Sequence, residues 1–422
     1  MKLHALELPY TKNTIQNICN TTPNKVLLLA LTLMFLTIIP LCLNHSQSPL
    51  QPPQINSSAL RSKEVQTKCD IFSGKWIPYP NGPYYSNLTC SLIIDQQNCM
   101  KFGRSDTEFM KWRWKPDECE LPLFDAVQFL ELVRGKSIAF VGDSVGRNQM
   151  HSLLCLLASV SALLFITANF KSWNYADYNF TLAVFWSPFL VKAHDADPEG
   201  HSLNSLMSLY LDEVDESWAS QIETFDYVII SAGQWFFRPL IYYENNQAVK
   251  CHSCNIKNIT AVTRYYGYSM AFRTAFQAIL RLKDYKGVTF LRTFSPQHFE
   301  NGDWNKGGNC VRTRPFTNQE MKFDGYLKEM YLTQVEEFRT AEKQARTKGL
   351  RFGLLDTTEI MLLRPDGHPN HYGHSRHKNV TVADCVHWCL PGPIDTWNEF
   401  LLYMLKTDHQ RSVDSKPMKK AP

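Results

Sequence analysis

The chain has 422 residues, of which 44% are hydrophobic, 13% aromatic and 20% charged, and this composition excludes a disordered protein. The formal net charge is only +4, and no long basic run lies beside aromatic repeats, which argues against nucleic acid as a partner. At roughly 150 residues per domain, the length accommodates two or three folded units.

The first predicted element is a membrane anchor. Residues 26–43 carry no charge, and at ~1.5 Å per residue a helix of this length spans about 27 Å, enough for a thin bilayer. Three lysines and one acidic residue, Glu7, precede it, which favours a cytosolic N terminus. We therefore predict a cytoplasmic tail over 1–25, an uncleaved signal anchor over 26–43 and a lumenal remainder. A cleaved signal peptide is the alternative, but the apolar run exceeds the usual length and no small-x-small cleavage site follows it.

The next segment, 44–68, is rich in Pro, Ser and Gln and predicts an extended lumenal stem. Ten of the twelve cysteines lie after residue 60, an even number that is typical of proteins with disulfides in an oxidising compartment. Candidate N-glycosylation sites on the same side are Asn56, Asn87, Asn179, Asn258 and Asn379. Together these features predict a protein of the secretory pathway.

Residues 69–135 are dense in Cys, Trp, Pro and Gly and have little sustained periodicity, which predicts a loop-rich, disulfide-stapled subdomain. The candidate disulfide cysteines of the lumenal part are Cys69, Cys90, Cys99, Cys119, Cys155, Cys310, Cys385 and Cys389. Cys251 and Cys254 have the spacing of a redox motif, but they do not open a helix after a strand. A structural disulfide or two separate bridges is therefore favoured for them.

The region 136–406 has a different rhythm, in which short apolar runs alternate with helical patterns. The runs cover residues 137–141, 181–186, 227–232, 288–294 and 351–356, and the clearest helical patterns follow the first run and cover 265–282 and 321–348. This alternation predicts an α/β domain with a parallel sheet covered on both faces. The polar residues 407–422 are predicted to form a frayed tail.

Gly142-Asp143-Ser144 follows the first predicted strand and opens a helix. In open α/β sheets the ligand site lies beyond the carboxyl ends of the strands. A serine at this position exposes its Oγ, and the helix N terminus stabilises a developing oxyanion. The alternative is that Ser144 only caps the helix. A base elsewhere in the chain decides between the two interpretations.

Asp384-Cys385-Val386-His387 supplies a candidate base. On a helical turn, residues three apart face the same side, so Asp384 can accept the Nδ1 proton of His387 and leave Nε2 free to take a proton from a serine. Alone, this spacing is more typical of a surface pair than of a catalytic site. Together with Ser144 it has the order nucleophile, orienting acid and base of a hydrolase triad.

The stretches IAFVGDSVGRNQM and DCVHWCLPGPIDTW resemble the plant trichome birefringence-like (PC-esterase) family, whose motifs place it among the SGNH/GDSL esterase-like folds. The resemblance extends over nearly all of the chain after the stem, through CDIFSGKW, KWRWKPDECELP, TFSPQHFENGDWNKGGNC and LLDTTEIMLLRPDGHP. It implies a three-layer αβα domain with a parallel sheet and a disulfide-rich N-terminal subdomain.

The resemblance also implies a function. It describes a single-pass type II enzyme of the Golgi membrane that transfers acetyl groups to hydroxyls of a cell-wall polysaccharide, with Ser144 as nucleophile, His387 as base and Asp384 as its partner. DCVHWCLPGPIDTWNEF and SAGQWFFRP are most similar to the xyloglucan branch. No bound cofactor is implied; an acetyl donor of unknown identity is required, and a membrane protein that passes acetyl groups across the bilayer is an implied partner. The alternatives are a mannan or xylan acetyltransferase, a polysaccharide acetyl esterase, and a non-catalytic polysaccharide-binding wall protein.

The oxyanion hole departs from the wider SGNH pattern, because no glycine occurs between Gly146 and Gly200. The third strand is followed by Gly233 and Gln234, which with Asn148 are the candidate oxyanion donors. Candidate sugar-stacking residues are Trp235, Trp304 and Trp388.

Two further patterns concern the same C-terminal region. His368, His371, His374 and His377 recur every third residue, but Pro369 and Gly373 interrupt any helix that would align them, so we predict no metal site. Because Cys385 and Cys389 flank His387, bridges to distant cysteines such as Cys310 and Cys99 would clamp the catalytic turn, although many other pairings exist.

Overall fold

The computed structural model describes residues 69–160, 164–167, 170–196, 205–374 and 382–414. The predicted cytoplasmic tail, anchor and stem lie outside these residues. In the described part of the chain, no helix has the length and apolar character needed to cross a membrane. The described residues belong to one compact unit, which contains both predicted motifs.

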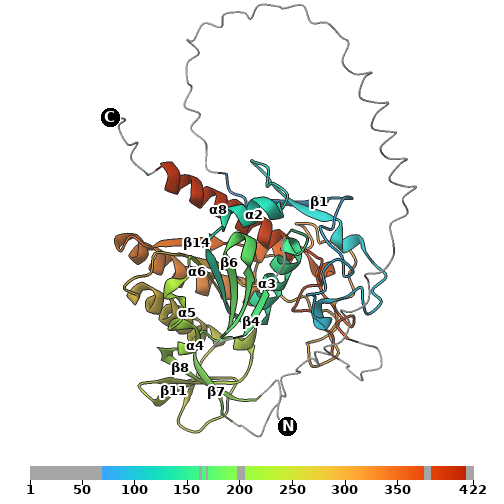
Figure 1. Ribbon diagram of the computed structural model, residues 1–422. Helices are drawn as coiled ribbons and strands as arrows, with labels where there is room; N and C mark the ends of the chain where they lie inside the picture. Colours follow the sequence, from blue (N-terminus) through green and yellow to red (C-terminus); the bar gives the residue numbers. More distant parts are fainter. Residues whose placement is uncertain (1–68, 161–163, 168–169, 197–204, 375–381, 415–422) are drawn as a thin grey trace, which may run out of the picture. The chain divides into compact units, whose positions relative to one another are not determined.

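The centre of this unit is a seven-stranded sheet with strand order β14-β13-β9-β3-β6-β5-β4 (Figure 1). Five neighbouring strands are parallel: β14 (Arg351–Leu355), β13 (Val288–Arg292), β9 (Tyr227–Ser231), β3 (Ser137–Gly142) and β6 (Phe180–Trp186). They coincide with the five predicted apolar runs, so the predicted α/β fold with a parallel sheet is confirmed for these strands.

Two strands at one edge are antiparallel and were not predicted. They are β4 (Leu164–Thr167) and β5 (Lys171–Tyr175), and β5 pairs with β6. Only a short turn joins β5 to β6, with Asn179 in the left-handed conformation at φ 46°. A parallel pairing needs a long crossover connection, so this link is compatible only with an antiparallel pair. The sheet is therefore mixed, although mostly parallel.

Helices cover both faces of the sheet. Along β3, Ile138 and Phe140 point into one apolar cluster and Ala139 and Val141 into the other, as the period-2 geometry of a strand requires. The first face is covered by α2 (Ala126–Leu132), α3 (Ser144–Leu157) and α8 (Asp395–Asp414), and the second by α5 (Arg264–Arg281) and α6 (Gly325–Thr347). The domain thus has the predicted three layers.

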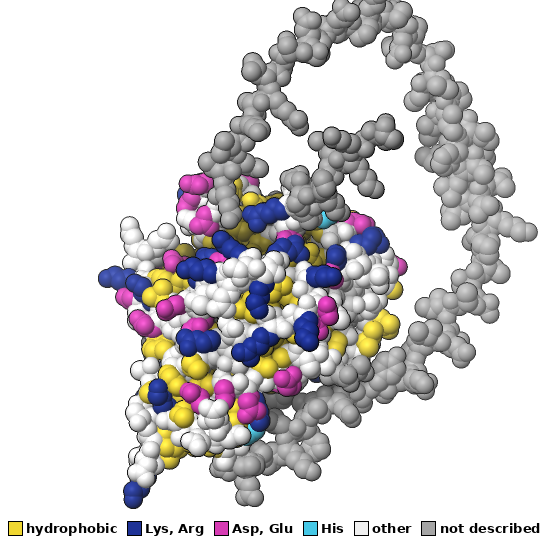
Figure 2. Space-filling view, turned by 90° about the vertical axis from the view of Figure 1, so that its left-hand side faces the viewer, with side chains coloured by type: hydrophobic (Ala, Val, Ile, Leu, Met, Phe, Trp, Pro, Cys, Tyr) yellow, Lys and Arg dark blue, Asp and Glu magenta, His cyan; other side chains and the backbone are white. Residues whose placement is uncertain are grey.

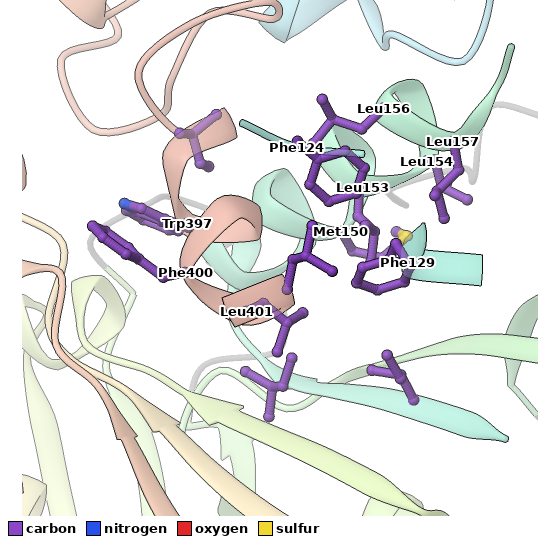
Figure 3. Close-up of a cluster of buried hydrophobic side chains, with 14 of the residues drawn as sticks. Phe124, Phe129, Met150, Leu153, Leu154, Leu156, Leu157, Trp397, Phe400 and Leu401 are labelled. Carbon is purple, nitrogen blue, oxygen red and sulfur yellow. The ribbon is translucent and has the colours of Figure 1, made fainter. Parts of the chain in front are cut away.

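Helices α3 and α8 contribute to one apolar cluster on the first face. Figure 3 shows Met150, Leu153 and Leu157 of α3, Trp397, Phe400 and Leu401 of α8, and Phe129 of α2, which all belong to this cluster. All seven side chains are buried. Burial of this apolar surface holds α3, which carries Ser144, in a fixed position on the sheet.

A second, five-stranded sheet was not predicted. Its strand order is β12-β11-β10-β8-β7, and its strands are β7 (Val191–Asp195), β8 (Met207–Val214), β10 (Leu240–Glu244), β11 (Gln247–His252) and β12 (Thr260–Ala261). The remaining elements are short: β1 (Gly74–Pro78), β2 (Trp112–Pro116), α4 (Glu216–Ala219), α7 (Thr358–Leu362) and several 3₁₀ turns.

The cysteine-rich region does not form a separate core. Trp76 and Trp114, on the paired strands β1 and β2, belong to the same apolar cluster as Ile138 of the central sheet. The indole N–H of Trp76 also donates to the carbonyl of Ile360 at 2.9 Å. This region is loop-rich as expected, and its core is continuous with that of the α/β domain.

The C-terminal end also differs from expectation, because α8 continues to Asp414 through the first half of the predicted frayed tail. Near its end, Arg351 of β14 binds both carboxylate oxygens of Asp408, at 2.7 and 2.8 Å, which ties the helix to the sheet edge. On the face seen in Figure 2, Lys and Arg side chains are interspersed with Asp and Glu.

Candidate active site

Ser144 is the first residue of α3, directly after the carboxyl end of β3. Asp143 caps the helix, and its Oδ1 accepts hydrogen bonds from the backbone N–H groups of Val145 and Gly146, not from that of Ser144. A Cβ on Gly142 would lie 1.6 Å from the carbonyl oxygen of Ser231, and a Cβ on Gly146 would lie 2.5 Å from the Oγ of the same serine. The two glycines therefore let the strand-to-helix turn approach β9 closely, with Ser144 at the carboxyl end of β3.

Asp384 and His387 meet Ser144 across 243 residues of sequence. The Nε2 of His387 lies 2.7 Å from the Oγ of Ser144, and its Nδ1 lies 2.8 Å from the Oδ2 of Asp384. Because a carboxylate only accepts, Nδ1 carries the imidazole proton and Nε2 is the acceptor for the serine hydroxyl. The side chains of His387 and Asp384 are each 27% exposed, so the site is open to solvent on one side.

The turn that holds this pair is not helical, in contrast to the prediction. The Oδ1 of Asp384 accepts the backbone N–H groups of Val386 and His387, at 3.1 and 2.9 Å, which closes an Asx-type turn. The backbone of Asp384 also pairs with that of Asn370 in both directions at 2.8 Å. The Asp384 side chain thus closes a turn that brings Asp384 and His387 together, as a helical turn would have done.

The charges of the pair support each other. Burial raises the pKa of Asp384, but the charge of His387 and the hydrogen bonds to the carboxylate outweigh this effect and lower the pKa to about 2. Burial likewise lowers the pKa of His387, and the charge and hydrogen bond of Asp384 outweigh it, so that this pKa is raised above 6.5. A histidine with a raised pKa is a stronger base toward the serine proton.

Asn148, one of the candidate oxyanion donors, contacts the base turn. It is fully buried on α3; its Oδ1 accepts the backbone N–H of Trp388 at 2.7 Å, and its Nδ2 donates to the carbonyl of Trp388 at 3.3 Å. Both ends of the amide are therefore engaged with the residue after His387. The Asn148 side chain therefore joins α3, which carries Ser144, directly to the turn that carries His387.

A second support comes from His368, which belongs to the histidine series of the sequence. It is buried, its Nδ1 donates to the carbonyl of His387 at 2.7 Å, and its Nε2 lies 2.7 Å from the Nδ1 of His298. Burial lowers the pKa of His368 well below 6.5, which keeps this imidazole uncharged. The repeating histidines contained no pattern that identifies this role, because the contact requires two loops far apart in sequence.

Of the other histidines in the series, His371 is exposed and His377 lies outside the described residues. Within the described residues, no group of three or more His, Cys, Asp or Glu side chains is arranged to hold a metal ion.

Two disulfides flank the base turn. Cys310 is bonded to Cys385 and Cys99 to Cys389, which is the arrangement suggested by the position of these cysteines around His387. The other bonds join Cys69 to Cys119, Cys90 to Cys155 and Cys251 to Cys254. The turn is thus tied on both sides to distant parts of the chain.

The remaining oxyanion candidates differ in availability. The Nε2 of Gln234 donates to the carbonyl of Ser295 at 2.8 Å, so its amide is engaged. Gly233 follows β9 at the same edge as Ser144, and a Cβ there would lie 2.4 Å from the ring of Phe294. The backbone N–H of Ser144 lies at the N terminus of α3, and Gly233 follows β9, the strand next to β3.

The three candidate stacking tryptophans have different surroundings. Trp388 is fully buried, stacked on His368 at 4.1 Å with its indole N–H donating to Ser295, so it is a core residue and not a sugar platform. Trp304 is half-buried in the loop closed by the Glu300–Asn309 bridge. Trp235 is half-buried beside Trp186, a residue that the sequence placed only inside a predicted strand.

Three of the glycosylation candidates are described. Asn179 and Asn258 are exposed in turns and Asn87 is half-buried, with its neighbour Leu88 strongly exposed. Asn56 and Asn379 lie outside the described residues.

Comparisons with known proteins show which family the chain belongs to. Residues 67–120 match the PMR5 N-terminal domain, and residues 121–404 match the GDSL/SGNH-like acyl-esterase family found in Pmr5 and Cas1p. The chain is 51% identical to Protein trichome birefringence-like 19 of Arabidopsis thaliana over 91% of this chain and 94% of that protein. It is 54% identical to trichome birefringence-like 20 of the same plant, over 80% and 72%. It is 44% identical to Xyloglucan O-acetyltransferase 4 of Populus trichocarpa, over 91% and 92%. The chain therefore belongs to the trichome birefringence-like, GDSL/SGNH-like acyl-esterase family.

Proposed function

We propose that this protein transfers acetyl groups to hydroxyls of a plant cell-wall polysaccharide through an acetyl-Ser144 intermediate. The observation that carries the proposal is the continuous chain of contacts from the Oγ of Ser144 through His387 to Asp384 at the N terminus of α3. A serine that only capped the helix would need no such base, and Asp143 already caps α3.

In the first half-reaction, the Oγ of Ser144 attacks the carbonyl carbon of the acetyl donor while the Nε2 of His387 takes the hydroxyl proton. Asp384 stabilises the imidazolium that forms. Donors at the N terminus of α3 stabilise the oxyanion. The bond from the acetyl carbon to the donor then breaks, and His387 returns its proton to the leaving group, which leaves acetyl-Ser144.

In the second half-reaction, a hydroxyl of the polysaccharide attacks the acetyl-serine, and His387 takes its proton and then returns it to Ser144. Water attacking in its place would give net ester hydrolysis, so transfer requires that the acceptor exclude water from the site. An acetyl esterase is therefore the neighbouring activity, and acceptor dependence separates the two.

Xyloglucan is the acceptor that we propose. The support is the similarity to relatives named xyloglucan O-acetyltransferase, including one of Arabidopsis thaliana that is 39% identical over 81% of this chain. The two relatives of higher identity named above carry no substrate in their names. We further propose a type II location in the Golgi membrane, with segment 26–43 as anchor, and a membrane protein as the supplier of acetyl groups to the lumen.

The test compares Ser144→Ala with wild type, and with Ser220→Ala, an exposed serine directly after α4, as the control. With 4-nitrophenyl acetate as donor and no acceptor, mass spectrometry should find one acetyl group on the peptide that contains Ser144. With a xyloglucan oligosaccharide added, Ser144→Ala should lose transfer by about 10³-fold or more, whereas Ser220→Ala should retain it. Near-normal transfer by Ser144→Ala would refute the mechanism, and acetate release that does not respond to the acceptor would assign the protein as an esterase.

A further inference from the structure

Trp186 is a large apolar side chain that the structure leaves exposed beside the candidate nucleophile. It is the last residue of β6 and 44% exposed, whereas Trp218, Trp388 and Trp397 are fully buried. In the sheet it pairs directly with Gly142, the second residue before Ser144. The backbone N–H of Ser187 donates to the carbonyl of Gly142 at 2.9 Å, which keeps the two strand ends in this register.

The indole of Trp186 is held in place by its neighbours. The guanidinium of Arg147 lies 5.1 Å from its ring centre, and the ring of Trp235 meets it edge-on at 5.6 Å and 79°. Trp235 is in turn fixed by Phe189 at 5.8 Å and by the guanidinium of Arg238 at 4.5 Å. We name Trp186, Trp235, Arg147 and Arg238 the aromatic platform. Since these side chains are already held in place, they lose little further conformational entropy when a ligand binds to the platform.

The platform is also tied to the catalytic helix. Arg147 lies on the first turn of α3, three residues after Ser144, and residues three apart lie on the same side of a helix. Its Nε is buried with no hydrogen-bond partner among the described residues. Its guanidinium carbon lies 5.1 Å from the ring centre of Trp186, so this arginine connects the catalytic helix to the exposed indole.

The chemistry of the platform matches a sugar chain. One face of a pyranose ring presents C–H groups that pack on an indole, and its rim presents hydroxyl oxygens that accept hydrogen bonds from a guanidinium. Covering the exposed part of Trp186 removes apolar surface from water and is favourable by roughly 25 cal/mol per Å². An acetyl group offers too little surface to use such a platform.

We propose that the aromatic platform is an acceptor subsite, on which one pyranose unit of the polysaccharide stacks over Trp186 and thereby positions a neighbouring unit's hydroxyl at acetyl-Ser144. This inference rests on the proposed function, because it assigns the acceptor half of that reaction. It makes a separable statement, namely that the platform serves the second half-reaction and not the first.

The experiment measures the two half-reactions separately in Trp186→Ala and Trp186→Phe. The rate of acetyl-enzyme formation from 4-nitrophenyl acetate reports the first, and the KM for a xyloglucan oligosaccharide in transfer reports the second. Trp186→Ala should raise the acceptor KM at least ~10-fold, equivalent to about 1.4 kcal/mol, with a much smaller change in acetyl-enzyme formation. Trp186→Phe keeps an aromatic face and should recover most of the acceptor affinity. Phe165→Ala, at an exposed aromatic residue on edge strand β4, is the matched control and should change neither quantity.

A binding measurement keeps this test independent of catalysis. Calorimetric binding of the same oligosaccharide should weaken at least ~10-fold from Ser144→Ala to the double variant Ser144→Ala/Trp186→Ala. Unchanged binding and an unchanged acceptor KM would overturn the subsite, as would an equal loss in both half-reactions, which would indicate structural damage. If Ser144→Ala retained transfer while Trp186→Ala weakened glycan binding, the proposed mechanism would fail and the subsite would stand.

Discussion

At the scale of single residues, Asp384 organises the candidate site. One carboxylate oxygen accepts two backbone N–H groups and the other accepts the Nδ1 proton of His387. These contacts hold the pKa of Asp384 at about 2, so the carboxylate is ionised throughout the pH range of catalysis. The same contacts raise the pKa of His387 against the effect of burial. A single residue therefore sets the shape of the turn, the tautomer of the base and its proton affinity.

The first prediction at this scale concerns Asp384→Asn. Transfer requires neutral His387, and its raised pKa places the acid limb of the pH–rate profile above pH 6.5 in the wild type. Without the carboxylate, burial dominates and lowers the pKa of His387, so the acid limb should move to lower pH. The plateau rate should fall by about 10⁴-fold, because the imidazole loses its correct tautomer. Asp95→Asn, at an exposed acid paired with Lys101, is the control and should leave the limb in place. A limb that moves upward in Asp384→Asn would contradict this electrostatic account.

At the scale of elements, α8 combines a large apolar face with two buried acids. Trp397, Phe400 and Leu401 are buried in the apolar cluster that also contains Met150 of α3 (Figure 3), while Asp395 and Glu399 are almost completely buried. Burial is the main cause that raises the pKa of Asp395 to about 6 and that of Glu399 to about 7. Asp395 accepts hydrogen bonds from Tyr85 and Ser152 and Glu399 accepts one from Tyr84, so the helix binds both the cysteine-rich region and α3.

The second prediction follows from the sign of these shifts. The folded protein binds the Glu399 proton more tightly than the unfolded chain, whose glutamate has a pKa near 4.5. This group therefore stabilises the fold most at low pH, and its contribution is lost as pH rises from about 4.5 to about 7, at up to about 1.4 kcal/mol per pH unit. The free energy of unfolding, measured with urea across this pH window, should fall less steeply with pH for Glu399→Gln than for the wild type. The exposed Glu108→Gln should follow the wild-type slope; a Glu399→Gln slope equal to wild type would show that this carboxyl does not titrate on folding.

At the scale of the whole molecule, disulfides connect the layers around the site. Cys90–Cys155 ties the N-terminal region to α3, and Cys99–Cys389 and Cys310–Cys385 tie two distant loops to the base turn. The last two bonds close 290 and 75 residues of chain, respectively. In the chain-entropy account, a crosslink that closes a long loop destabilises the unfolded state more than one that closes a short loop.

The third prediction compares two disulfides. Cys310→Ser/Cys385→Ser should lower the free energy of unfolding by about 2–5 kcal/mol, and it should also reduce transfer at temperatures where the protein stays folded, because Cys385 is adjacent to Asp384. Cys251→Ser/Cys254→Ser removes a bond of sequence separation 3, and it should have a much smaller effect on both quantities. Denaturant unfolding and transfer rates of the two variants provide the measurement. Equal effects in both would exclude a specific role of the Cys310–Cys385 bond at the site.

Some features were determined by the sequence itself, because their cause is local. Strands β3, β9 and β13 are continuous apolar runs that parallel pairing buries on both faces, and such runs are visible without any partner. Ser144 after a strand and Asp384 three residues before His387 are likewise local patterns, and hydrogen bonds within the turn are enough to join the latter pair. The fold class and the candidate triad were therefore predictable.

Other features were decided only by the tertiary structure. The roles of Asn148 and Trp388 follow from the packing of α3 against a loop 240 residues away, and that of His368 follows from the carbonyl of His387, which lies opposite its ring. In the sequence, Trp186 looks like one more apolar strand residue. Only its pairing with Gly142 at the carboxyl ends of β3 and β6 places this exposed side chain near Ser144. Local periodicity specifies the elements of this protein, but the contacts between them are set by long-range packing, to which each residue contributes only a small part of the free energy.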